Sequence, residues 1–101
     1  MASYTIPTTS LSHVVDCMDS KHASHQMAFK LNGSVTAGTL KVEAKSPGDD
    51  SYRAIPDCDA IDLKDPIPRL FTYGVNQYKF TVSGFAGDAK QIYITDTLLE
   101  V

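Results

Sequence analysis

Three histidines and a cysteine lie close together near the start of the chain: His13, Cys17, His22 and His25. Imidazole nitrogen and thiolate sulfur are ligands that zinc prefers in proteins, but the spacing does not match the paired ligands of a closed tetrahedral site. If residues 11–18 form a strand, His13 and Cys17 share a face but lie about 13 Å apart, too far to bind one ion. The segment therefore predicts a buried thiol beside solvent-facing histidines, and no metal site.

Four aspartates crowd the segment DCDAIDLKD: Asp57, Asp59, Asp62 and Asp65. Calcium binds several carboxylates on a flexible loop, and D-x-D opens many such loops. An EF-hand loop begun at Asp57 would need glycine and glutamate where this chain has Asp62 and Pro68. We therefore expect the carboxylates to flank a short edge strand, where charge hinders pairing with the edge of another sheet. No metal or other cofactor is predicted.

The sequence contains no recognisable catalytic motif. The nucleophile motif G-x-S-x-G, the phosphate-binding P-loop and the dinucleotide fingerprint do not occur. Two glycines lie three residues apart in GFAGDA, but this stretch joins two expected strands instead of opening a helix. We therefore expect a protein that is not an enzyme.

The elements that position these side chains are β-strands, because apolar residues recur at every second position. In TLKVEAK, three apolar residues alternate with polar ones, as in a strand with one buried face. Three further segments, HQMAFKLNG, NQYKFTVSG and KQIYITDT, repeat the alternation, and LSHVVDCM, YRAIP, AIDL and LFTY are weaker candidates. The residues expected to point inward are Met27, Phe29, Leu31, Leu40, Val42, Ala44, Tyr78, Phe80, Val82, Ile92 and Ile94.

Turn sequences rich in Gly, Asn, Asp and Pro separate these segments, as in NGS, SPGDD and GFAGD. Seven or eight short strands predict one all-β domain over residues 1–101, an antiparallel two-sheet sandwich of the jelly-roll or Ig-like type, with a small barrel as the alternative. If successive strands run antiparallel, SPGDDS and GFAGD lie at one end of the sandwich. Asp49, Asp50 and Asp88 are then the candidate ligand-binding side chains of that end.

Composition and charge exclude several classes of partner. The chain has 101 residues, of which 43% are hydrophobic and 21% charged, as in a globular protein. Nine basic residues against twelve acidic ones leave a net charge of −3, so we expect no binding to nucleic acid, which requires a basic face. We expect synthesis in a cytoplasm and no membrane association, since no signal peptide or long apolar run is visible. Cys17 and Cys58 are expected to be reduced and buried in preference to forming a disulfide.

Several apolar side chains are candidates for protein contacts. Phe85 is expected at an exposed hairpin tip, and Tyr93 points opposite to Ile92 and Ile94 on its strand. The final segment, TLLEV, carries Leu98, Leu99 and Val101 where a frayed tail would be polar. Two alternatives remain open for it: docking on its own domain or docking on a neighbouring subunit.

Two stretches, GTLKVEAKSPGDDSYRAIP and NQYKFTVSGFAGDAKQIYIT, carry a resemblance to a known group of proteins. They are similar to small β-sandwich structural proteins of bacteriophage virions, in which a strand of the type G-T-hydrophobic-x-hydrophobic-E runs into a Gly/Asp turn and then an aromatic leads into Ile-Pro. The resemblance spans about Gln26 to Thr95 and rests on strand and turn patterns. Tyr52 stands where tryptophan is common, and the acidic segment after Pro56 has no counterpart.

The resemblance implies a structural subunit of a virion, either decorating the head or associated with a tail or fibre. Such a subunit would contact other virion proteins and copies of itself as a symmetric homo-oligomer, of which a trimer is one form. The alternative from another functional class is a carbohydrate-binding or host-adhesion module that binds glycan through the Asp49, Asp50 and Asp88 loops.

Overall fold

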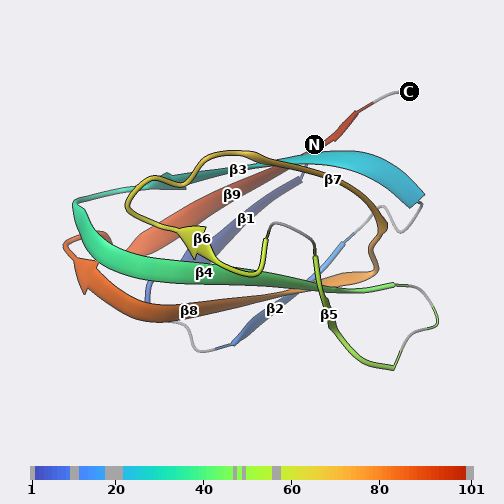
Figure 1. The fold of residues 1–101 in the computed structure, drawn as a ribbon, viewed down its shortest axis with the longest axis horizontal. Helices are drawn as coiled ribbons and strands as arrows, with labels where there is room; N and C mark the ends of the chain where they lie inside the picture. The colour runs from blue at the N-terminus through green and yellow to red at the C-terminus, as the bar shows by residue number, and fades with distance from the viewer. Residues whose placement is uncertain are drawn as a thin grey trace.

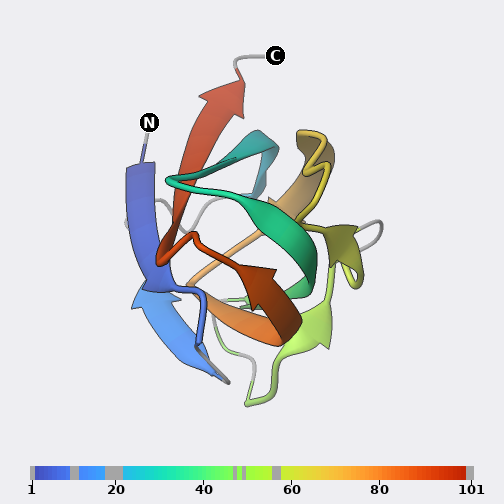
Figure 2. The same cartoon turned by 90° about the vertical axis from the view of Figure 1, so that its left-hand side faces the viewer.

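The computed structural model describes residues 2–9, 12–17, 22–46, 48, 50–55 and 58–99. The described residues form nine β-strands and no helix, and the strands build two antiparallel sheets packed face to face (Figures 1 and 2). The all-β sandwich expected from the sequence is thus confirmed. No helix capable of crossing a membrane is found in the part of the chain that the structure describes.

Each sheet is built from strands distant in sequence. The first sheet has the order β1 (Ala2–Pro7), β9 (Gln91–Leu99), β3 (His22–Leu31) and β7 (Arg69–Gly74). The second has the order β2 (His13–Asp16), β8 (Gln77–Gly87), β4 (Val35–Lys45) and β5 (Arg53–Ala54), with β6 (Ile61–Asp62) also paired to β4. The edge strands of the first sheet are therefore β1 and β7.

The core lies between the sheets and follows the alternation of the sequence. The predicted inward sets of β4 and β8 are fully or almost fully buried, and Ile92 and Ile94 of β9 are buried with them. Met27 is buried, while Phe29 and Leu31 are partly buried and pack against the same cluster. Burying each large apolar side chain contributes roughly 1.5–3 kcal/mol. The inward residues predicted from the sequence are confirmed.

One strand of the first sheet was not anticipated. β1 pairs with β9 in the register Tyr4↔Ile94 and Ile6↔Ile92. Its residues show the same alternation over a short stretch, since Ile6 is fully buried and Tyr4 is partly buried between exposed Ser3 and Thr5. This short alternation was the available sequence signal for the strand.

The two shortest strands, β5 and β6, are successive pieces of one interrupted edge strand. Both run antiparallel to β4, with Ala54 opposite Glu43 and Ile61 opposite Leu40. The expected reversal of the chain between YRAIP and AIDL is therefore wrong. The chain therefore runs along the length of the sandwich one time fewer than the prediction assumed. Each loop after β6 lies at the end of the sandwich opposite to the predicted one.

The candidate ligand loops are consequently separated. Asp88 lies in the turn before β9 and accepts a hydrogen bond from the Ser34 hydroxyl, at 3.1 Å, in the turn between β3 and β4. Asp50 follows the other end of β4, beyond Lys45, which is paired with Gln77. The prediction that the Asp50 and Asp88 loops share one end is wrong, and Asp49 lies outside the described residues.

Candidate binding site

The predicted contact residue Phe85 is not at an exposed hairpin tip. β8 continues to Gly87, so Phe85 is a strand residue, and its partly buried ring packs against the core cluster. The ring also lies against Gly38, where an added Cβ would come within 3.0 Å of it. The turn expected at residues 84–88 begins only after Gly87, because β8 pairs with β4 through irregular registers as far as Val35.

The remaining predicted contact residues fall on β9 and beyond it. Tyr93 is 38% exposed, in agreement with its outward direction, and its hydroxyl donates to Gln91. Leu98 and Leu99 pair with His25 and Ser24 of β3, so this part of the tail docks on its own domain. Val101 lies outside the described residues.

A buried polar cluster, formed by His25, Asp96 and Tyr78, lies inside the sandwich. His25 Nδ1 is 2.9 Å from Asp96 Oδ1 and 3.1 Å from Oδ2, and the Tyr78 hydroxyl donates to Oδ2 at 2.7 Å. The three residues come from β3, β9 and β8, and His25 is 0% and Asp96 2% exposed. The expectation of a solvent-facing His25 is wrong, because His25 shares the inward face of β3 with Met27.

The cluster lies among buried and aromatic side chains. Burial raises the pKa of the Tyr78 hydroxyl far above its usual value, and the charge of Asp96 and its hydrogen bond add to that increase. The ring of Phe71 stacks on His25 with 4.9 Å between centroids. The Ser24 hydroxyl points away from His25 and lies 3.1 Å from the Thr72 hydroxyl on β7. Neighbouring strand residues face opposite sides, so the Ser24 hydroxyl does not join the cluster.

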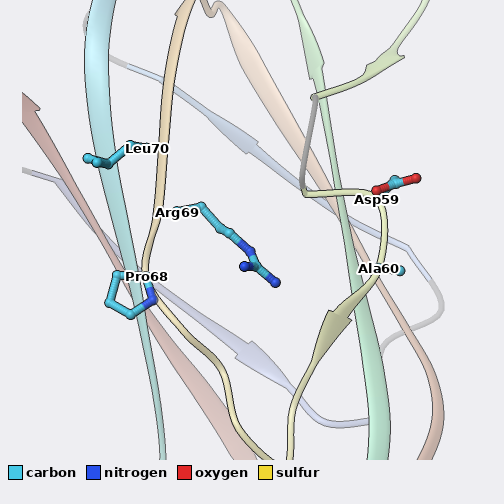
Figure 3. A pocket seen from close by; sticks show the side chains of 5 residues that line it. All are labelled: Asp59, Ala60, Pro68, Arg69 and Leu70. Carbon is cyan, nitrogen blue, oxygen red and sulfur yellow. The ribbon is translucent and has the colours of Figure 1, made fainter.

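A hollow on the surface lies between β6 and β7, and we call it the β6–β7 groove (Figure 3). It has a volume of about 500 Å³ and is lined by Asp59, Ala60, Pro68, Arg69 and Leu70. The Arg69 side chain extends from the β7 side across the opening, whereas the carboxylate of Asp59 points away from it (Figure 3). The groove therefore presents a cation and an anion that do not meet each other.

Exposed apolar side chains surround the same edge of the first sheet. Leu70 on β7 is 67% exposed, and Ile67 in the preceding loop is 56% exposed. Leu70 points to the other side of β7 from Arg69 (Figure 3). It also lines a second hollow of about 280 Å³, together with Ser24, His25, Phe71 and Thr72. Because β7 is the last strand of its sheet, no strand of the described residues pairs with its outer edge. Nothing in the sequence patterns singled out this edge.

The predicted acidic corner does not assemble into a metal site in the described part of the chain. No group of three or more histidine, cysteine or carboxylate side chains that could hold a metal ion occurs there. Asp59 and Asp62 are exposed, and the Asp62 carboxylate accepts the backbone N–H of Lys64 at 2.9 Å. Asp57 lies outside the described residues. Cys17 and Cys58 are both buried thiols.

Comparison of the chain with models of protein families, with curated proteins and with solved structures finds no match. The resemblance to virion proteins accordingly stays a prediction from strand and turn patterns.

Proposed function

We propose that this protein is a structural assembly subunit that acts through protein contacts at the β7 edge and not through catalysis. The observation that carries the proposal is the exposure of Leu70, at 67%, on the unpaired edge strand beside the β6–β7 groove. Exposed apolar side chains on an open sheet edge favour association with another polypeptide. This surface replaces the Phe85 hairpin tip as the centre of the contact.

The position of the buried polar cluster supports a role without catalysis. His25 and Asp96 have the residue types of a general base and its orienting carboxylate, but they are 0% and 2% exposed. Their hydrogen bonds join three strands, which is what a structural cluster inside a sandwich does. His25 also lines the hollow of about 280 Å³ beside β7, but its side chain exposes no surface to solvent.

We further propose that the assembly is a bacteriophage virion, in which the protein decorates the head or belongs to the tail or a fibre. This part rests on the sequence resemblance over Gln26 to Thr95. Mass spectrometry of purified particles tests it, because a structural subunit copurifies with the particle in fixed stoichiometry. Presence of the chain in the lysate but not in purified particles would contradict a virion location.

Sedimentation equilibrium of the purified protein over a wide concentration range tests the assembly role. We expect a homo-oligomer at high concentration, and we expect Leu70→Thr to weaken it at least tenfold. Val14→Thr is the matched control, because Val14 is 48% exposed on β2, in the other sheet. A wild-type protein that stays monomeric throughout, or equal effects of the two substitutions, would overturn the proposed contact.

A further inference from the structure

Arg69 is a cation with a buried hydrogen-bond donor that the described part of the chain leaves without an acceptor. Its Nε is buried and has no hydrogen-bond partner. No ion pair within 4.0 Å joins Arg69 to any acid among the described residues. The Arg69 side chain is partly buried, and it extends across the opening of the groove (Figure 3). A guanidinium presents its N–H groups as a planar fork that matches a carboxylate.

Asp59 supplies the opposite charge on the other wall of the groove. Its side chain is exposed, it makes no hydrogen bond or ion pair among the described residues, and it points away from Arg69. The interrupted edge strand is the reason, because the break between β5 and β6 places Asp59 outside the regular β4 ladder. Each charge of the groove is therefore available to another molecule.

We propose that two copies of this chain associate face to face across their β6–β7 grooves, with Arg69 of each copy bound to Asp59 of the other. This inference rests on the assembly role proposed above and names its contact. A two-fold interface uses the same patch on both copies, so a residue i that contacts j implies that j contacts i. A patch that carries one unused cation, one unused anion and exposed Leu70 and Ile67 is complementary to itself.

The two charges of the groove favour a second copy over a purely acidic or purely basic partner, because such a partner would pair with only Arg69 or only Asp59. Each copy carries a net charge of −3, so two copies repel one another at long range and need a local attraction to associate. Two reciprocal Arg69–Asp59 pairs provide that attraction at the contact. A standard protein interface covers about 800 Å² per partner. An interface of that size extends from the groove over Ile67 and Leu70.

Charge reversal tests the pairing by sedimentation equilibrium at low ionic strength. We expect Arg69→Glu and Asp59→Arg, each alone, to raise the dimer dissociation constant at least tenfold, because each places two like-charged pairs in the interface. The double variant restores both pairs, and so does an equimolar mixture of the two single variants. In that mixture each variant carries the complement of the other, so the heterodimer forms although neither homodimer does.

Lys64→Glu and Asp65→Arg are the matched controls, since they reverse the same charges at exposed positions that do not line the groove. If a reversal unfolds the chain, Arg69→Gln and Asp59→Asn replace it, and these are expected to weaken the dimer without restoration on mixing. If the wild-type protein forms an oligomer and the groove reversals leave its dissociation constant unchanged, the pairing is refuted and the assembly role still holds. The same conclusion follows if neither the mixture nor the double variant recovers dimer formation. A wild-type monomer refutes the assembly role itself.

Discussion

Replacing Asp96 by alanine removes the acceptor at the centre of the buried polar cluster. The Tyr78 hydroxyl and His25 Nδ1 both lose the carboxylate that lies 2.7 Å and 2.9 Å from them. Neither group reaches water, because both residues are fully buried. The substitution therefore leaves two buried polar groups, 3.4 Å apart, without the carboxylate that joins them.

The expected cost follows from these losses. An unsatisfied buried polar group costs about 1–3 kcal/mol. Two such groups lose the carboxylate in Asp96→Ala, so we expect the substitution to lower the free energy of unfolding by about 4 kcal/mol. Against a typical total of about 5–15 kcal/mol, the variant would be barely folded.

Urea unfolding followed by circular dichroism measures the loss. With a denaturant slope of about 1–3 kcal/mol per molar, the transition midpoint should fall by more than about 1 M. Tyr78→Phe is the milder variant if Asp96→Ala does not fold, because it removes one hydrogen bond to a carboxylate, worth about 1.5–3 kcal/mol, and keeps the ring.

A fully apolar replacement decides whether the cost comes from stranded polar groups. Removal of a whole buried polar cluster is often neutral or stabilising, so His25→Leu, Asp96→Leu and Tyr78→Phe together should recover at least half of the stability lost in Asp96→Ala. A loss below about 1 kcal/mol in Asp96→Ala, or a triple variant as unstable as the single one, would refute the reasoning.

Two further predictions concern pH and backbone geometry. The pKa of the Tyr78 hydroxyl is raised in the folded state, so the folded protein keeps a proton that the unfolded chain releases near pH 10. The stability that this group contributes is complete below about pH 10. Above that pH it falls by about 1.4 kcal/mol per pH unit. Urea titrations between pH 8 and 11 should give a flatter curve for Tyr78→Phe, and an unchanged slope would contradict this. Gly87→Ala should cost more than about 2 kcal/mol, because the added Cβ would collide with the Ser34 carbonyl oxygen at a φ of 143°. Gly84→Ala is its control, with a φ of 61° but no atom within 4 Å, and should cost about 1 kcal/mol; equal losses would show that the collision is relieved.

The alternation of the sequence predicted which side of each strand is buried. Leu40 and Val42 of β4, and Tyr78 and Phe80 of β8, are inward as expected, because successive strand residues point to opposite faces whatever their neighbours are. The same rule placed Tyr93 outward, and it also applied to His25, whose polar character obscured its inward position.

Pairing between strands was beyond the reach of these local patterns. Asp96 reaches His25 across 71 positions of sequence and Tyr78 across 18, and only the sheet order β9-β3 opposite β8 brings the three together. The single crossing made by β5 and β6 likewise decided at which end each later loop lies, and it separated Asp50 from Asp88.

The β6–β7 groove is a feature that only the tertiary structure decided. Asp59 and Arg69 were visible in the sequence as an exposed acid and an unremarkable base, and no spacing rule joins them. Both residues line one groove because β4 holds the interrupted strand in one sheet while β3 holds β7 in the other. Side-chain direction is a property of each strand alone, and the sequence determined it; which strands become neighbours depends on long-range registers that only the packed sheets select.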